Sequence, residues 1–164
     1  MVLDHTVVGV EGPAHERTWT PKDTMLYALG AGAGTSGLEF TTEKGQRVLP
    51  TFAVLAAQAP RPPLGDFDPA LLVHAEQAAR AGFDRPILHG LCTYAVTGRT
   101  LPHLVAGSDP ARFQAMSGRF TSPVFPGESL TVSIWVDGGE VLFRTAKDDG
   151  TVVLDRGRAT ILPP

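Results

Sequence analysis

His89 and Gly90 lie where an extended segment of this sequence meets a predicted helix, a position at which a polar side chain and an uncovered backbone could take part in chemistry. Pro86 favours an extended backbone just ahead of it, because the residue before a proline is pushed out of α-helical space. Gly90 has no side chain, so its backbone stays uncovered where a ligand carbonyl could approach. The apolar run from Leu88 to about Leu104 predicts a buried central helix. The first N–H groups of such a helix, at the positive end of its dipole, would polarise that carbonyl.

Other residue types with chemical potential do not combine into a second site. The single cysteine, Cys92, excludes an internal disulfide and a cysteine-rich zinc site, and its apolar surroundings predict a buried, inert thiol. Gly30–Gly34 lacks the Lys and Ser/Thr of a phosphate-binding loop. The histidines show no metal-ligand spacing; they are His5, His15, His74, His89 and His103. We therefore expect no metal and no other cofactor.

The composition is that of one globular domain. The chain has 164 residues, of which 43% are hydrophobic and 19% charged. A chain of this length can bury a hydrophobic core without disulfides or a structural metal. The net charge of −3 gives no basic surface that would attract nucleic acid. No apolar stretch approaches the roughly 18 residues of a membrane-spanning helix, and no targeting segment is recognisable. We therefore expect a cytoplasmic protein with no nucleic-acid or membrane partner.

The N-terminal part predicts a strand followed by a short helix. His15–Thr20 reads as a strand. A helix is expected over Asp23–Leu29, because Thr20 can cap it and Pro21 suits its first position. A second apolar segment, Leu49–Leu55, begins beside a proline. The residues that the first helix should bury lie on one face: Met25, Leu26 and Leu29.

The C-terminal part predicts a helix over Leu71–Arg80, the central helix, and then a run of strands. Alternating apolar residues and turn signals place these strands within residues 112–124, 130–136, 141–145, 151–154 and 158–162. A long helix followed by an antiparallel meander is an α+β layout, in which the helix packs across the sheet.

Three stretches resemble the MaoC-like (R)-specific enoyl-CoA hydratases, or hydratase 2 family, whose fold is the hot dog. Ala81–Cys92 resembles the start of the family's central helix, and Arg119–Leu130 resembles its following strand and turn. Leu26–Gly30 together with Val48–Phe52 resembles the opening of longer members that contain two hot dogs. The resemblance therefore implies a hot-dog fold in which a long central helix is wrapped by an antiparallel sheet.

The resemblance also implies an unusual domain layout. In the longer members the first hot dog has lost its catalytic groups and the second is active. This chain resembles the front of the first joined to the back of the second. We expect one hot-dog domain over residues 1–164, with a divergent part (1–73) and a better-matching part (74–164).

The family's catalytic motif, Gly-Asp-x-Asn-Pro-x-His, has an altered counterpart in this chain. It begins at Gly65, and Asp68 stands where the motif has Asn. Asp66 and His74 would be the acid–base pair, but they lie eight residues apart where the motif places them five apart. The resemblance assigns the oxyanion-stabilising N–H to Gly90. It also implies substrate contacts from three residues around that N–H: Arg85, His89 and Leu91.

Three functions stay open on this basis. The first is reversible hydration of an enoyl thioester of CoA or acyl-carrier protein, by a homodimer or a hot-dog heterodimer. The second is a non-catalytic hot-dog subunit that binds acyl thioesters or supports an active partner, which the Asp66-to-His74 spacing favours. The third is a hot-dog thioesterase, for which Asp84 or Glu76 would supply the carboxylate near the central helix.

Overall fold

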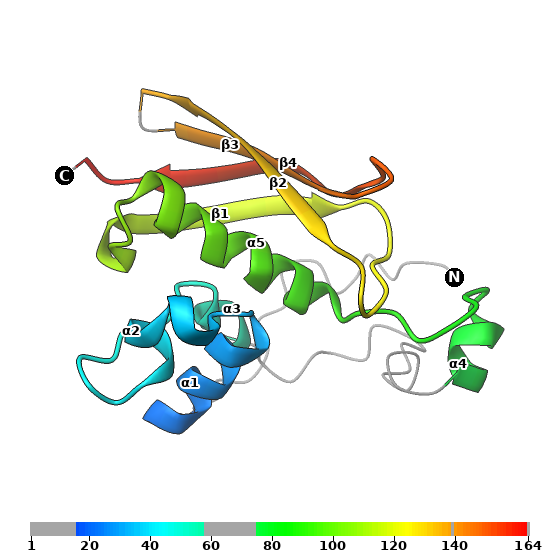
Figure 1. Cartoon of the computed structure of the whole chain (residues 1–164), viewed down its shortest axis with the longest axis horizontal. Helices are drawn as coiled ribbons and strands as arrows, with labels where there is room; N and C mark the ends of the chain where they lie inside the picture. The colour runs from blue at the N-terminus through cyan, green and yellow to red at the C-terminus, as the bar shows by residue number, and fades with distance from the viewer. Residues whose placement is uncertain (1–15, 58–74, 139, 164) are drawn as a thin grey trace, which may run out of the picture.

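An antiparallel sheet forms one layer of the molecule, and a long helix crosses it (Figure 1). The computed structural model describes residues 16–57, 75–138 and 140–163. Within these residues the sheet has four strands in the order β1-β4-β3-β2. They are β1 (Phe113–Phe120), β2 (Leu130–Asp137), β3 (Glu140–Lys147) and β4 (Val152–Ile161). The predicted α+β layout is confirmed.

The helices of the described residues fall into two groups. The N-terminal group lies on the far side of α5 from the sheet, and the second group consists of α5 and the short helices before and after it (Figure 1). The N-terminal group is α1 (Pro21–Gly30), η2 (Gly34–Ser36), α2 (Leu38–Thr41) and α3 (Phe52–Ala56). The others are α4 (Ala75–Arg80), α5 (Gly90–Val105) and η4 (Pro110–Arg112). The central helix is thus confirmed, beginning two residues after the predicted Leu88.

The last strand is one element where the sequence predicted two. β4 runs through Asp155–Gly157, which has the polar and glycine composition of a turn. Arg156 adopts a left-handed φ of 51°, and the pairing with β3 shifts register between Phe143 and Thr145. A β-bulge absorbs the extra residue while the ladder continues, so the apparent break lies inside a strand.

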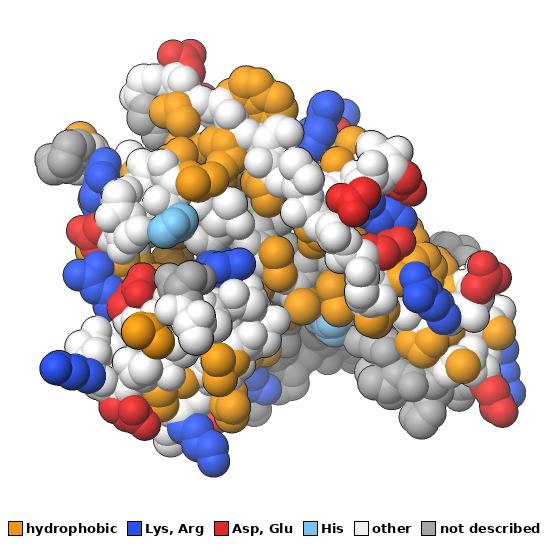
Figure 2. All heavy atoms as spheres, in the orientation of Figure 1, with side chains coloured by type: hydrophobic (Ala, Val, Ile, Leu, Met, Phe, Trp, Pro, Cys, Tyr) orange, Lys and Arg blue, Asp and Glu red, His pale blue; other side chains and the backbone are white. Residues whose placement is uncertain are grey.

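One hydrophobic core fills the space between α5 and the sheet. A buried hydrogen bond between the hydroxyls of Thr97 on α5 and Thr145 on β3, 2.9 Å apart, fixes the helix against the strand. The buried side chains of this core are Leu101, Ala106, Val141, Phe143, Leu154, Ala159 and Ile161. On the face seen in Figure 2, hydrophobic side chains are spread over the middle of the molecule among backbone and side chains of other kinds, with charged side chains between and around them.

The cap of α1 forms as the sequence predicts. The N–H of Thr20 donates to Asp23 Oδ2 at 2.7 Å, and the N–H of Asp23 donates to Thr20 Oγ1 at 3.4 Å. The Thr20 hydroxyl also donates to Asp23 Oδ2 at 2.7 Å, and this bond, together with that from the Thr20 N–H, lowers the pKa of the Asp23 carboxyl. The predicted buried face is wrong, however. Leu26 and Leu29 are 56% and 50% exposed, because α1 packs through Thr24 and Ala28 instead.

A second core of small residues lies between α5 and the N-terminal helices. Its buried members are Ala28, Ala31, Ala33, Phe40, Leu49 and Ala95. The strand predicted for His15–Thr20 is also wrong within the described residues, since 16–20 form no strand. Trp19 instead packs edge-on against Phe52, with ring centroids 5.8 Å apart.

Candidate functional site

The backbone N–H groups at the start of α5 differ in their hydrogen bonding to the part of the chain that the structure describes. The N–H of Leu88 donates to the carbonyl of Val124 at 2.6 Å, which anchors the segment before the helix to the loop after β1. The N–H of Leu91 donates to His89 Nδ1 at 3.0 Å, and the N–H of Cys92 donates to the His89 carbonyl at 2.8 Å. The N–H of Gly90 has no partner among the described residues. It lies at the positive end of a 16-residue helix, where an oxyanion is stabilised.

His89 is an exposed helix cap, and its cap bond fixes its chemistry. Since Nδ1 accepts a hydrogen bond, the neutral ring carries its proton on Nε2. The free Nε2–H can then donate to a polar group of a ligand that approaches Gly90. This arrangement is compatible with the predicted substrate contact, which stays a prediction.

The packing around Gly90 does not itself require a glycine. A Cβ at this position would lie 3.4 Å from the Phe120 ring, which is an ordinary contact distance. Gly98, two turns further along α5, differs because its Cβ would overlap Thr51 Cγ2 and lie 3.2 Å from Met116 Sδ. Among the described residues Gly90 thus has room for a methyl group, so its small size is available to a ligand.

Arg85 lies over an aromatic ring near the helix start. Its guanidinium carbon is 4.8 Å from the centroid of Phe125, and Phe83 meets the same ring edge-on. Glu128 holds this loop by accepting the N–H of Phe125 at 2.8 Å. That bond, with the nearby Lys147 ammonium, lowers the pKa of the Glu128 carboxyl. The loop therefore presents Arg85 as an exposed cation on a supported ring.

A pocket of about 320 Å³ lies beside the start of α5. It is lined by Tyr27, Gly30, Ala31, Leu55, His89, Leu91, Cys92 and Ala95. Leu91, predicted to contact substrate, is therefore a wall residue. Cys92 is half-buried, and its burial raises the pKa of the thiol. The raised pKa makes the thiol a poor nucleophile, but Cys92 is half-buried where the sequence predicted a buried side chain, and it faces a pocket that the sequence did not reveal.

The predicted acid–base pair, Asp66 and His74, lies outside the described residues. The structure therefore brings Arg85, His89, Gly90 and Leu91 to one end of α5 without testing the pair. The thioesterase carboxylates, Asp84 and Glu76, are both exposed.

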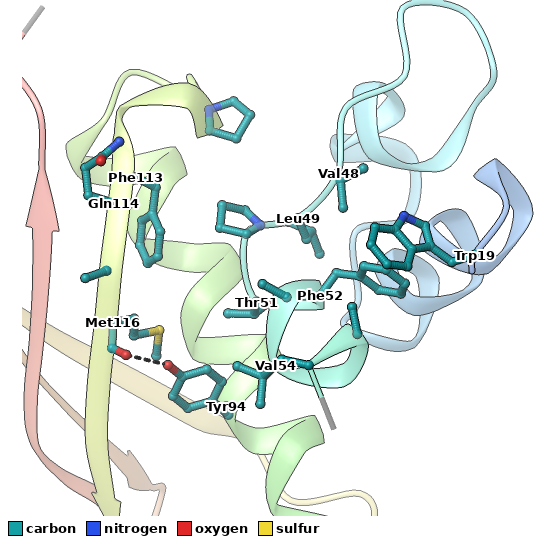
Figure 3. Close-up of a pocket in the computed structure, with 16 residues that line it drawn as sticks. Trp19, Val48, Leu49, Thr51, Phe52, Val54, Tyr94, Phe113, Gln114 and Met116 are labelled. Carbon is teal, nitrogen blue, oxygen red and sulfur yellow. Dashed lines mark hydrogen bonds between the residues drawn. The ribbon is translucent and has the colours of Figure 1, made fainter. Parts of the chain in front are cut away.

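Sequence reasoning also missed an apolar groove of about 790 Å³ between the N-terminal segments and β1 (Figure 3). Trp19, Leu49 and Phe52 lie on one side of it, and Phe113 and Met116 of β1 lie on the other. Between them, the hydroxyl of Tyr94 donates to the Met116 carbonyl at 2.8 Å. The apolar segment Leu49–Leu55 was the signal that could have indicated this space.

The start of α5 and most of the sheet lie within a stretch of sequence that matches a known protein family. The family described as MaoC like domain matches residues 65–157, which include the whole of α5 and most of the sheet. This chain belongs to the MaoC-like dehydratase family. The MFE-2 hydratase 2 N-terminal domain matches residues 18–84, so two matches overlap over the stretch that contains Asp66 and His74.

The MaoC-like chain resembles curated proteins with two hot-dog halves. The 3-hydroxyacyl-thioester dehydratase Y of Mycobacterium tuberculosis (strain ATCC 25618 / H37Rv) is 28% identical over 283 aligned positions, covering 96% of this chain and 98% of the relative. Because that alignment exceeds the 164 residues of the chain, the relative contains a long stretch with no counterpart here. This agrees with the predicted shortened layout.

The probable enoyl-CoA hydratase 2 of Dictyostelium discoideum is 38% identical over 157 residues, covering 94% of this chain and 47% of the relative. The chain thus spans about half the length of that protein. The solved structure of full-length peroxisomal multifunctional enzyme type 2 from Drosophila melanogaster superposes with a TM-score of 0.77. At 20% identity it covers 87% of this chain and 47% of that one, which confirms the hot-dog fold.

Two further observations concern the described residues alone. None of their helices is long and apolar enough to cross a membrane. None of their His, Cys, Asp and Glu side chains gather in threes as a metal site would require. The cytoplasmic location stays a prediction, since the Drosophila neighbour is named as a peroxisomal protein.

Proposed function

We propose that this chain is an (R)-specific enoyl-thioester hydratase, which reversibly hydrates a trans-2-enoyl thioester to the 3-hydroxyacyl thioester. The observation that carries the proposal is the N–H of Gly90 at the start of α5, which has no hydrogen-bond partner within residues 16–57, 75–138 and 140–163 and lies beside an apolar pocket. Membership of a family whose relatives are named as hydratases and dehydratases supports it.

The reaction needs an oxyanion donor and an acid–base pair. Water adds its oxygen to C3 while a base takes its proton, and C2 receives a proton from an acid. Negative charge accumulates on the thioester oxygen, where the N–H of Gly90 would stabilise it. Loss of one such donor costs on the order of 3 kcal/mol of barrier. We assign the proton transfers to Asp66 and His74 and expect no metal or other cofactor.

The residues around Gly90 have supporting roles in this proposal. His89 Nε2–H and Arg85 are free to contact the polar carrier, whether CoA or acyl-carrier protein. Leu91 contacts the acyl group from the pocket wall. We expect the chain to be one domain over residues 1–164 that assembles as a homodimer or with another hot-dog subunit.

A non-catalytic acyl-thioester-binding subunit is the second candidate. The observation that favours it is the overlap of the two family matches at residues 65–84. In that stretch Asp66 and His74 keep the residue types of the catalytic motif but not its spacing. Misplacement of a catalytic group by about 1 Å costs roughly 100-fold in rate, so the spacing is the larger threat to activity.

Hydration of trans-2-butenoyl-CoA by the full chain tests the proposal, followed as loss of the conjugated thioester's absorbance. Asp66→Asn and His74→Ala are measured beside the parent, with chiral analysis of the product. Turnover to the (R)-3-hydroxy product that collapses in both variants supports the assignment. Turnover unaffected by either variant contradicts the acid–base roles. A parent that binds the thioester without turnover supports the non-catalytic subunit instead, and CoA release without hydration supports a thioesterase.

A further inference from the structure

A cleft of about 230 Å³ lies between α2 and the second half of α5. None of its lining residues lines the pocket beside Gly90 or the groove of Figure 3. Arg99 is nine residues beyond Gly90, which corresponds to roughly 14 Å along the helix. The cleft is therefore separate from the site at the start of α5. Its α2 wall includes Glu39 and Phe40, and its α5 wall includes Arg99, Pro102, His103 and Leu104.

Arg99 presents a fixed guanidinium to this cleft. Its Nε donates to the carbonyl of Ala31, at the end of α1, at 2.9 Å. A Cβ on Gly32 would lie 3.6 Å from Arg99 Nη2, so the group also packs close to the backbone there. Its terminal N–H groups have no hydrogen-bond partner within residues 16–57, 75–138 and 140–163. A planar fork held in this way matches a carboxylate, whose two oxygens can accept from it together.

Glu39 places the opposite charge on the facing wall. Its carboxylate forms no ion pair with Arg99 or with any other cation in the part of the chain that the structure describes. The charged residues that follow α2 and α5 pair with each other instead, since Arg47 Nη1 lies 3.1 Å from Asp109 Oδ1. Two opposite charges thus line one cleft without contacting each other or a third group.

The rest of the lining suits a short hydrocarbon group. Phe40 and Pro102 are buried side chains that form part of the two walls. The hydroxyl of Thr100, which also lines the cleft, donates to the Val96 carbonyl at 3.1 Å, so its oxygen can still accept a hydrogen bond. A volume of about 230 Å³ lies below the roughly 300–1,000 Å³ of pockets for drug-sized ligands, which favours a ligand of few heavy atoms.

We infer that this cleft binds a small α-amino acid, whose carboxylate pairs with Arg99 and whose ammonium pairs with Glu39. Its side chain lies against Phe40 and Pro102. An anion alone would leave Glu39 unpaired, and a cation alone would leave Arg99 unpaired, so a ligand that carries both charges matches the cleft. The inference is independent of the proposed function, since neither the thioester nor Gly90 takes part.

Calorimetric titration of the full chain with L-valine and two analogues tests the charge requirement. Isovalerate keeps the carbon skeleton and the carboxylate of valine but lacks the ammonium. Isobutylamine keeps the ammonium but lacks the carboxylate. We expect saturable one-to-one binding of L-valine, at least about ten-fold tighter than that of either analogue, because each analogue loses a charge-assisted contact and leaves one protein charge unpaired.

Glu39→Gln is the diagnostic variant, and Glu43→Gln is its matched control. Glu43 is exposed, lies four residues further along the chain and is outside the cleft lining. Glu39→Gln should lose the preference for L-valine over isovalerate, whereas Glu43→Gln should keep it. Because two ligands are compared in one protein, this result does not depend on a change in stability.

Arg99→Gln and its control Arg47→Gln test the other charge in the same way. Arg99→Gln should lose the preference for L-valine over isobutylamine, and Arg47→Gln, whose position is outside the cleft lining, should keep it. Should Arg99→Gln fail to fold after losing its bond to Ala31, the Glu39→Gln comparison decides alone.

The inference is overturned if neither L-valine nor L-alanine binds the parent, or if isovalerate, isobutylamine or inorganic phosphate binds as tightly as L-valine. It is also overturned if folded Glu39→Gln keeps the parent's preference, or if trans-2-butenoyl-CoA displaces L-valine, which would place the amino acid beside Gly90. The titration needs no turnover, so a chain without hydratase activity would leave this test unchanged.

Discussion

The two sides of α5 differ in the size of the side chains that meet them. Toward the sheet the buried core contains Leu101, Val141, Phe143, Leu154 and Ile161. Toward the N-terminal helices, four of the six buried members of the core are alanines. Large side chains interlock and leave little space, whereas alanines bring backbones close and leave gaps at their margins. The pocket beside Gly90 lies on the alanine-rich side, since Ala31 and Ala95 line it, whereas the groove beside Trp19 lies between the N-terminal segments and β1.

This difference indicates a division of roles along one helix. The sheet side stabilises the position of α5, and the opposite side has room for a ligand. The N–H of Gly90, which has no partner among the residues that the structure describes, benefits from both sides, because a firmly held helix keeps that donor in place beside the pocket. Substitutions on the two sides of α5 should therefore change the free energy of unfolding by different amounts, and the sheet side should show the largest loss.

Removing a large side chain from the sheet core should cost the most stability. Phe143→Ala deletes a ring that is 2% exposed, and we expect the free energy of unfolding to fall by about 3–5 kcal/mol. Leu142 is the next residue in the same strand and is 39% exposed, so Leu142→Ala should lower the free energy of unfolding by less than about 1.5 kcal/mol. Urea denaturation measures both. Equal losses would contradict a core that is concentrated between α5 and the sheet.

Adding a methyl group on the helical side tests how closely the backbones approach there. Gly98→Ala places a Cβ against Thr51 Cγ2, and overpacking of this kind costs about 1–3 kcal/mol. Gly30→Ala is the control, since nothing lies within 4 Å of its Cβ. Thermal unfolding should show a lowered midpoint for Gly98→Ala alone. A midpoint unchanged by Gly98→Ala would mean that the N-terminal helices are not held against α5.

The buried Thr97–Thr145 hydrogen bond should show strong coupling between α5 and β3. Thr97→Val leaves the Thr145 hydroxyl unpaired, at a cost of about 1–3 kcal/mol. Adding Thr145→Val should recover most of that loss, because an apolar pair of the same shape is nearly neutral. A double-mutant cycle in urea measures the coupling. Additive losses would show that the two hydroxyls act independently.

Glu128 should make a small, pH-dependent contribution beside the start of α5. The N–H of Phe125 and then Lys147 lower its pKa in the folded state. Its stabilising effect is therefore present above the unfolded pKa and is lost as the pH falls through the lowered folded value. Glu128→Gln should be less stable than the parent at neutral pH and should converge with it in acid. Unfolding midpoints across that range test this, and a constant difference would contradict it.

The sequence predicted the elements whose signals are local. The Thr20 cap, the central helix and the strands predicted within 112–124, 130–136 and 141–145 each depend on residues close in the chain, and each is confirmed. Leu26 and Leu29 were placed inside because apolar periodicity does not show which neighbour a helix will have. The core there consists mainly of alanines, and among the larger side chains of α1 Tyr27 packs against it while Leu26 and Leu29 face outward. The bulge at Arg156 was missed because a turn-like composition can also lie within a continuous strand.

The site was predicted only in part, because only its local sequence signals could be interpreted. His89 and Gly90 are adjacent in sequence, and their junction could be identified locally. The pocket joins α1, α3 and α5, whose residues lie far apart in the chain, so no spacing rule predicts it. The roles of Asp66 and His74 stay predictions. Because the spacing of the motif is altered there, the activities of the Asp66→Asn and His74→Ala variants are the measurements that these roles require.

The central claim is that the backbone of Gly90 is kept open for the thioester. The most direct measurement compares Gly90→Ala with the parent in kcat/KM for trans-2-butenoyl-CoA and in thermal unfolding, on the same preparations. Since the added methyl group meets only an ordinary contact with Phe120, stability should change by no more than about 0.5 kcal/mol. We expect kcat/KM to fall by roughly 100-fold, because the substrate is displaced by about 1 Å from the N–H. Unchanged stability with unchanged kcat/KM, or a parent without turnover, would contradict the account.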